Sequence, residues 1–468
     1  MAKKITLNLT DESRSPAKTI FLLAWPVFLE QIFTTLVSYA DTAMVGGMGK
    51  AATAAVSISN PVIFLLNGVV MSLGIGITSL VARAVGAGEP DKVRSLMRHA
   101  ILAIVYIGIP ICFINIALHR MIPMWMGAEP DVLEYAARYN LIVAVGRFFN
   151  ISSMILNSAF RGYGDTKTPL IVNTLMNVIN VCFNFILIFP TRMISVFGFE
   201  FKMFGAGLGI TGAAIATSIG MTVAGLITFY IAFFRKNEYR IDLKGNWRLD
   251  RPLTKQIFKI SLPAMLERLF MSSSGIFVNS SIALLGTTAL AANSLCLTAE
   301  SISFMPAFAF QTAATTLVGQ SLGAKKPKLA EKFVRTSIIL GTILMFFAGI
   351  GLFVFAKFLI GIFTPDLEVI ELGAQCLRIV AFMQIPQVIT WIYAGALRGA
   401  GDTKSIFYIT ASTNWLVRTI PSVIAIRFLG FGLVASQYII MAEILSRLLL
   451  SFIRYRSGKW KTIFEAKE

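Results

Sequence analysis

The chain has 468 residues, of which 56% are hydrophobic and only 14% are charged. This composition excludes an ordinary soluble globular protein, because a membrane-spanning helix needs about 20 mostly apolar residues and the chain can supply about a dozen such helices. The net charge of +18 would suggest a nucleic-acid partner in a soluble protein, but membrane proteins also collect basic residues in their cytoplasmic loops.

Taken in chain order, apolar stretches separated by glycine, proline or charge clusters predict twelve membrane-spanning helices. The first six are expected near residues 18–41, 54–82, 99–119, 134–158, 169–189 and 205–234. The second six are expected near residues 255–284, 289–319, 334–361, 370–396, 406–427 and 429–453.

The basic residues fall mostly on one side of these predicted spans. Of the 42 lysines and arginines, 30 lie in the two tails, in the loops after even-numbered spans or at the span ends beside them, whereas 6 lie in the loops after odd-numbered spans or at the span ends beside those. Basic residues concentrate in cytoplasmic loops, so both termini are predicted to be cytoplasmic in a multi-pass protein of the plasma (inner) membrane. The positive charge then needs no nucleic-acid partner.

The two halves of the sequence match at a constant offset of 237 residues. WPVFLEQ around Pro26 corresponds to LPAMLER around Pro263, and FRGYGDTK, which ends at Lys167, corresponds to LRGAGDTK, which ends at Lys404. Each copy holds six spans, an even number, so the halves have the same orientation and are related by an axis along the membrane normal.

The predicted fold class is therefore an all-α integral membrane protein with twelve transmembrane helices in two pseudo-symmetric six-helix bundles. The expected divisions are an N-terminal lobe (1–234), a cytoplasmic linker (235–259) and a C-terminal lobe (260–468). Two such bundles around a central cavity are typical of alternating-access secondary transporters. In the repeated loops, Asp165 and Asp402 are expected to cap the helices that follow.

Patterns typical of enzymes and cofactor sites are missing from the sequence. The four cysteines show no CxxC spacing, and the two histidines have no ligand-like neighbours. The segment GGMGKA at Gly46 lacks the residues that a phosphate-binding loop requires. No cofactor is expected.

Three motifs together resemble the multidrug and toxic compound extrusion (MATE) family. They are the paired Arg-Gly-x-Gly-Asp-Thr-Lys loops, the Pro-x-x-x-Glu at the start of the first and seventh spans, and YADTAMVGGMG beginning at Tyr39. The resemblance covers essentially the whole chain. It implies a monomeric antiporter in the lipid bilayer that exports amphipathic, often cationic drugs and toxic compounds in exchange for H⁺ or Na⁺.

Three alternative functions remain open at this point. One is a flippase for lipid-linked precursors of the same superfamily, which would have a strongly cationic cavity. Another is the membrane part of an ATP-driven pump, which would need a separate ATPase chain. The third is an intramembrane enzyme, which would need a clustered catalytic set of side chains.

Asp41, near the outer end of the first span, is the leading candidate for ion coupling, because ionisable groups inside a bilayer are costly. The repeat-equivalent position is Val278, so any such site belongs to the first half alone. A buried carboxyl can take up and release a proton near neutral pH, or it can ligate Na⁺ together with neighbouring oxygens.

The family resemblance implies that the partners of Asp41 lie on the fourth to sixth spans. Asn180 and Asn184 are one turn apart on one helix face. Asn184 stands where some prokaryotic relatives have a second aspartate, so the site has less charge with which to hold Na⁺. The predicted ion-coupling residues are Asp41, Asn180, Asn184, Ala213 (through its backbone) and Thr217. The predicted Na⁺ ligands are Asp41, Asn180, Asn184 and Thr217.

Further residues are predicted to contact substrate in the cavity. Glu267 is favoured over its repeat equivalent Glu30, because the resemblance implies that the second-half glutamate lines the cavity; Arg268 next to it points about 100° away and is a poor partner. The full set of predicted cavity residues is Glu30, Asn157, Glu267, Glu300 and Arg418.

Two other pairs of charged residues within the predicted spans have possible structural roles. Glu300 and Arg418 have no local partner, and they are interpreted either as a charge pair between spans or as substrate contacts. Glu443 and Arg447 are four residues apart on one helix face and are predicted to form a structural ion pair.

Overall fold

The computed structural model of the protein describes the whole chain except residues 1–8, 197–198, 236, 243–244, 246 and 464–468. In the first half, the helices are α1 (Pro16–Gly46), α2 (Lys50–Gly86), α3 (Pro90–Ala103), α4 (Ile109–Ala117), α5 (Met121–Trp125), α6 (Pro130–Gly162), α7 (Lys167–Leu187) and α8 (Ile210–Phe234). A π-helical turn, η1 (Ile104–Gly108), joins α3 to α4.

In the second half, the helices are α9 (Arg251–Ala283), α10 (Thr287–Gly323), α11 (Pro327–Val354), α12 (Ala356–Gly361), α13 (Leu367–Gly399), α14 (Thr403–Ser412), α15 (Ile420–Arg427) and α16 (Leu433–Arg456). A second π-helical segment, η2 (Thr413–Thr419), joins α14 to α15. A 3₁₀ turn, η3 (Lys459–Lys461), follows α16.

In the described part of the chain, the prediction of twelve transmembrane helices is confirmed if α3 with α4 is counted as one span and α14 with α15 as another. By length and apolar composition alone, 9 helices of the described residues could cross a membrane, or 10 if α10, which bends by 47°, counts as one span. The two spans outside that count are α9, which carries five charged residues in its first eighteen, and α14–α15 with η2 between them, which carries Lys404, Arg418 and Arg427.

Three predicted boundaries differ from the structure. The third span begins at Pro90 rather than near residue 99, because a proline suits the first turn of a helix. The sixth was expected from residue 205, but α8 begins only at Ile210, after two glycines with positive φ. The second half was expected to start after a linker ending at residue 259, but α9 already begins at Arg251.

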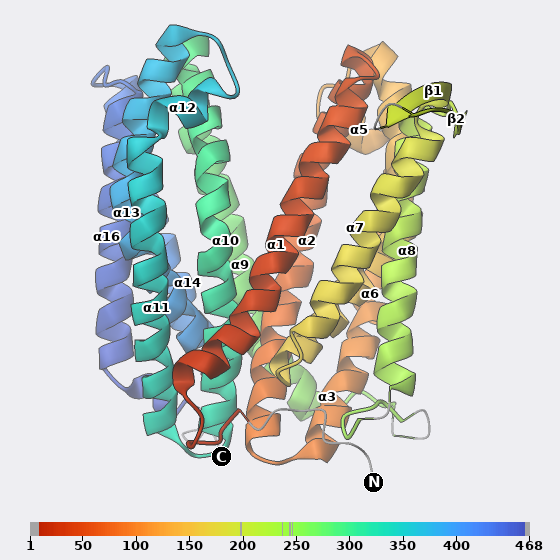
Figure 1. The fold of residues 1–468 in the computed structure, drawn as a ribbon. Helices are drawn as coiled ribbons and strands as arrows, with labels where there is room; N and C mark the ends of the chain where they lie inside the picture. Colours follow the sequence, from red (N-terminus) through yellow and green to blue (C-terminus); the bar gives the residue numbers. More distant parts are fainter. Residues whose placement is uncertain (1–8, 197–198, 236, 243–244, 246, 464–468) are drawn as a thin grey trace.

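The segment before α8 adds a small β-hairpin to an otherwise helical fold. Strands β1 (Pro190–Val196) and β2 (Phe199–Ala206) pair antiparallel, with Met193 opposite Lys202 and a register irregularity near Pro190. The hairpin lies beyond the end of α7 and the start of α8, at one end of the helix bundle (Figure 1).

Figure 1 shows α1–α8 and α9–α16 as two groups, or lobes, that approach each other at the end where both termini lie and diverge toward the end that carries α5, α12 and the hairpin. The closed end is called the junction here. At the junction, Leu23 and Val27 of α1 pack in one apolar cluster with Leu317 and Phe333 of the other lobe. Likewise, α9 residues such as Ile257 pack in the main cluster of the first lobe.

Hydrogen bonds across the junction follow the sequence repeat. Thr316 Oγ1 donates to the Arg161 carbonyl at 3.0 Å, and Ser79 Oγ donates to the Gly399 carbonyl at 3.3 Å. Gln320 Nε2 donates to the Gly162 carbonyl at 3.0 Å. Ser79 and Thr316 are equivalent at the 237-residue offset, and their acceptors lie one position apart in the repeat, so the two bonds are approximately pseudo-symmetric.

Glycines allow α2 and α10 to cross closely at the junction. A Cβ atom on Gly86 would lie 1.9 Å from the Gln320 carbonyl oxygen, and one on Gly323 would lie 2.1 Å from the Arg83 carbonyl oxygen. Each glycine therefore faces backbone of the other helix at the repeat-equivalent place. Backbone cannot rotate away as a side chain can.

We expect Gly86→Ala to push α2 and α10 apart. Overpacking of this kind costs typically about 1–3 kcal/mol, so the purified variant should unfold at a lower temperature than the wild type. The matched control is Gly275→Ala on α9, where an added Cβ would meet nothing within 4 Å. Equal unfolding temperatures for the two variants would contradict the close crossing.

The chain before α1 also reaches the second lobe. Leu9 is buried in the cluster formed by α1, α10 and α11. Lys326, in the loop between α10 and α11, donates through Nζ to the Thr10 carbonyl at 3.2 Å and pairs with Glu12 at 3.0 Å. This segment, residues 9–15, is called the N-terminal arm.

Candidate functional site

Four of the five predicted ion-coupling residues lie together in the first lobe. Asn184 Nδ2 on α7 donates to Asp41 Oδ1 on α1 at 2.7 Å. Asn180, one turn earlier on α7, contacts Thr217 Oγ1 on α8 at 3.1 Å. Ala213 packs instead with Val45 and Ile188 in an apolar cluster and makes no hydrogen bond to the other four in the described part of the chain.

The side-chain amide of Asn180 fits this site in two orientations. In one, its nitrogen donates to Thr217 and its oxygen accepts from Asn184 at 3.1 Å. In the other, its nitrogen donates to Asp41 Oδ1 at 2.8 Å and Oδ2 at 3.1 Å, and its oxygen accepts from the Thr217 hydroxyl at 3.1 Å. Which atom is nitrogen is an assignment that depends on the surrounding hydrogen bonds.

The two orientations differ in what they present to the Asp41 carboxylate. The first places an amide oxygen against carboxylate oxygens, an arrangement that needs a proton or a cation between them. The second suits a bare, charged carboxylate, because the amide then donates to it. Asn184 Oδ1 is also buried without a partner, so the site has a further oxygen to offer a cation.

The donors of this site are chemically suited to Na⁺ as well as H⁺. Within the described residues, no group of three histidine, cysteine, aspartate or glutamate side chains could hold a metal ion. Carboxylate, amide and hydroxyl oxygens are nevertheless hard ligands. Any Na⁺ here would be held by one carboxylate and neutral oxygens.

The repeat-related glutamates each pair with an arginine that the sequence analysis did not assign. Glu30 Oε1 accepts from Arg161 Nη2 at 2.5 Å and from Asn173 Nδ2 at 2.6 Å, whereas Glu30 Oε2 is buried with no partner. Arg161 lies in the first of the two Arg-Gly-x-Gly-Asp-Thr-Lys motifs, so the repeat itself contained the signal for this pair.

The second pair repeats the first with one difference. Arg398 Nη2 donates to both oxygens of Glu267 at 2.9 Å, and Thr410 Oγ1 donates to Glu267 Oε1 at 3.4 Å. Glu267 therefore has no unpartnered oxygen, unlike Glu30. The prediction that Arg268 is a poor partner for Glu267 agrees with this geometry.

A cavity of about 270 Å³ lies between the lobes. Glu30 and Asn157 line it, as predicted, but Glu267 does not, because its carboxylate is turned to Arg398. Asn157 donates to Ser153 at 3.1 Å, and its Oδ1 is buried with no partner. The other charged residues on the lining are Arg161, Arg268 and Arg398.

Glu300 and Arg418 lie inside the second lobe rather than on this cavity. Glu300 is buried and Arg418 is partly buried, and Arg418 is within electrostatic range of Glu300 and of Glu443. The cavity lining includes neither residue, which corrects their assignment as cavity residues. The interpretation as a charge cluster between helices fits their position.

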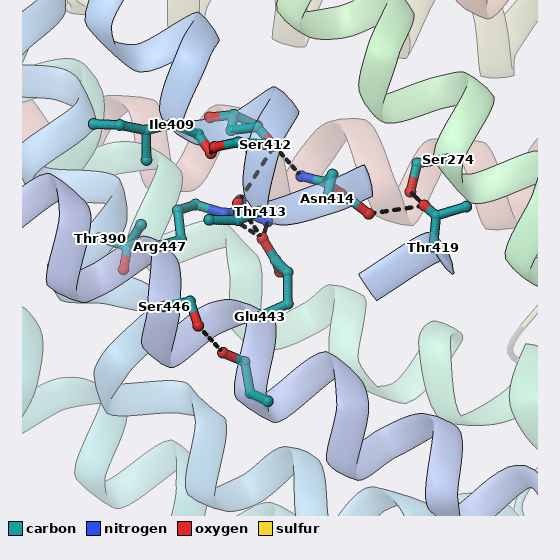
Figure 2. A network of polar contacts seen from close by, with 12 residues as sticks. Ser274, Thr390, Ile409, Ser412, Thr413, Asn414, Thr419, Glu443, Ser446 and Arg447 are labelled. Carbon is teal, nitrogen blue, oxygen red and sulfur yellow. Dashed lines mark hydrogen bonds and ion pairs between the residues drawn. The ribbon is translucent and has the colours of Figure 1, made fainter. Parts of the chain in front are cut away.

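Figure 2 shows the polar network next to this cluster. Glu443 on α16 accepts from Arg447 Nε at 2.8 Å and from Thr413 Oγ1 at 2.9 Å. The predicted ion pair of Glu443 and Arg447 is therefore confirmed. Ser274 and Thr419, whose hydroxyl oxygens are 2.6 Å apart, connect α9 to the end of η2.

The aspartates of the repeated loops behave differently from each other. Asp165 Oδ1 accepts from the Thr168 backbone nitrogen at 2.9 Å, as a helix cap does. Asp402 makes no such backbone bond, so its predicted role as a cap is wrong. It accepts instead from Ser405 Oγ at 2.8 Å and from Arg454 Nε at 2.7 Å.

The fold and the cavity between its lobes define a multi-pass membrane transporter rather than an enzyme. The sequence profile of the MatE family matches residues 26–186 and 263–424, one match in each half. The chain therefore belongs to this family, the multidrug and toxic compound extrusion transporters, as its motifs suggested.

Individual relatives agree with this assignment. The chain is 30% identical over 446 residues to a probable multidrug resistance protein NorM of Thermotoga maritima, covering 95% of this chain and 93% of that protein. It is 27% identical over 418 residues to a probable NorM of Mannheimia succiniciproducens, covering 87% and 85%. A solved structure described as an outward-facing multidrug resistance MATE family transporter matches the fold with a TM-score of 0.87 at 21% identity, over 98% of this chain and 100% of that one.

Proposed function

We propose that the protein is an antiporter that exports small amphipathic molecules, often cationic, in exchange for H⁺ or Na⁺. The observation that supports it most directly is the single carboxylate of Asp41, whose neighbours suit both the occupied and the empty form of an ion site. The multidrug resistance names of the relatives point to the same class of substrate.

The arrangement of the lobes suits alternating access. With both termini on the cytoplasmic side, as the basic residues predict, the junction closes the cytoplasmic side and the lobes diverge toward the outside (Figure 1). This state is then outward-facing. The junction contacts are discrete hydrogen bonds and close helix crossings, which can be broken as a set when the lobes rock.

Coupling requires that ion and substrate favour different states of the protein. Asp41 and Glu30 lie on the same helix, α1, and Glu30 lines the cavity. An ion that binds or leaves at Asp41 therefore acts on the helix that also contacts substrate. Glu30 is the acidic residue on the described lining, which supports a role in binding cationic groups.

The flippase alternative is supported less well. Two of the three arginines on the cavity lining are already paired with glutamates. A strongly cationic cavity would be needed for that function.

The proposed function is tested with the purified protein in proteoliposomes. A pH gradient and a Na⁺ gradient are imposed separately, and accumulation of cationic dyes such as ethidium is followed by fluorescence. One of the two gradients should drive dye movement, whereas protein-free liposomes should show none. If neither gradient moves any dye of the panel, the antiporter proposal is wrong.

A further inference from the structure

Arg268 lies on the wall of the central cavity without a partner. It belongs to α9, and in the described part of the chain it makes neither a hydrogen bond nor an ion pair. Its neighbour Glu267 cannot neutralise it at contact distance, because both of its oxygens are bound by Arg398. The guanidinium is therefore left with its donors available in the cavity.

A lone arginine at this place is costly. Its guanidinium stays charged at any ordinary pH, and a charge removed from water without a partner is destabilising. Charged residues in membrane-spanning helices are for this reason functional candidates. The other two arginines on the lining, Arg161 and Arg398, are compensated by Glu30 and Glu267.

The fold itself does not require a charge at this position. The repeat-equivalent residue is Gln31, which also lines the cavity and is uncharged. Since the same architecture accepts glutamine in the first lobe, the positive charge in the second lobe needs a separate reason. The described lining carries three arginines, Arg161, Arg268 and Arg398. Glu30 and Glu267 compensate two of them, so the charge of Arg268 remains uncompensated.

We propose that Arg268 binds an acidic group of the transported molecule, such as a carboxylate or a sulfonate. The guanidinium presents a planar fork of donors that matches such groups in a bidentate manner. Glu30, which also lines the cavity, is already paired with Arg161 and Asn173, so Arg268 is the charged group of the described lining that remains for a ligand. The substrate class is therefore an amphipathic molecule with an acidic group, which Arg268 binds.

The rest of the lining suits the body of such a molecule. Met71, Met154, Met176 and Phe308 provide an adaptable apolar surface on the same lining. As a statement about transport, this inference rests on the proposed function. As a statement about binding, it can be measured without any ion gradient.

The test uses two dyes that differ in one group. Rhodamine 110 carries a free carboxylate, and rhodamine 123 is its methyl ester. Binding of each dye to the purified full-length protein in nanodiscs is measured by fluorescence anisotropy. The variants are Arg268→Gln, which copies the repeat-equivalent residue, and Arg268→Lys, which keeps the charge but loses the fork. Arg378→Gln is the matched control, because Arg378 lies on α13 away from the cavity lining.

The wild type should bind rhodamine 110 at least tenfold more tightly than rhodamine 123. Arg268→Gln should weaken rhodamine 110 at least tenfold and leave rhodamine 123 unchanged, Arg268→Lys should fall between, and Arg378→Gln should retain the preference. Unfolding temperatures establish that each variant is folded. Equal binding of the two dyes by the wild type, or an unchanged preference in Arg268→Gln, would overturn the inference.

The same dyes separate this inference from the proposed function. If the binding preference depends on Arg268 but no ion gradient moves either dye, the antiporter proposal fails and the binding assignment stands. If a gradient drives transport of both dyes and Arg268→Gln changes neither, the antiporter proposal stands and the substrate class proposed here is wrong.

Discussion

Asp41→Asn should abolish ion-driven transport while the protein stays folded. An amide cannot take up a proton at this site and brings no negative charge to a Na⁺ ion. Asn184 can still donate to the new amide oxygen as it does to Asp41 Oδ1, so the local packing has little reason to change. The measurement is gradient-driven dye uptake into inverted membrane vesicles, with the unfolding temperature recorded in parallel.

The control for this variant is Glu371→Gln. Glu371 is an exposed carboxyl that pairs with Lys357, so the substitution removes the same charge at a surface far from the ion site. It should transport as the wild type does. Full gradient-driven uptake by Asp41→Asn would show that Asp41 does not carry the coupling ion.

Arg398→Gln should destabilise the protein by about 3–5 kcal/mol, the cost of leaving one partner of a buried ion pair uncompensated. Glu267 is 5% exposed, and both of its oxygens depend on the same guanidinium nitrogen. Thr410, at 3.4 Å, is too weak a donor to replace it. The effect should appear as a lower unfolding temperature in detergent.

The double variant Glu267→Gln, Arg398→Gln removes both charges and should recover most of this loss, since a neutral pair leaves no buried charge. Arg161→Gln in the first lobe should cost less, because Glu30 keeps its bond from Asn173 and faces the cavity. A double variant as unstable as Arg398→Gln alone would mean that the pair is not the source of the effect.

The sequence was sufficient for the helical architecture, because apolar run length, basic residues on alternate loops and the internal repeat are all local or periodic signals. The β-hairpin was not predicted: its strands lie almost entirely between the spans expected at 169–189 and 205–234, in a stretch expected to be a loop, and only the end of Phe199–Ala206 fell within the expected sixth span. The two glycines with positive φ that separate the hairpin from α8 determine where the helix begins.

Contacts within one helix were predictable and contacts between distant helices were not. Glu443 and Arg447 are one turn apart, so their pairing follows from helix geometry. The partner of Glu267 is 131 residues away on another helix, and only the folded arrangement identifies it as Arg398. The partners of Asp41 came from the family resemblance rather than from any local pattern.

The N-terminal arm contacts both lobes at the junction. Leu9 packs among side chains of both lobes, and Lys326 of the second lobe binds the Thr10 carbonyl and the Glu12 carboxylate of the arm. If the lobes separate at this end, the contacts of Leu9 and of Lys326 with the N-terminal arm must break. A tag or fusion partner placed directly before residue 9 would therefore lie next to contacts that alternating access has to break and re-form.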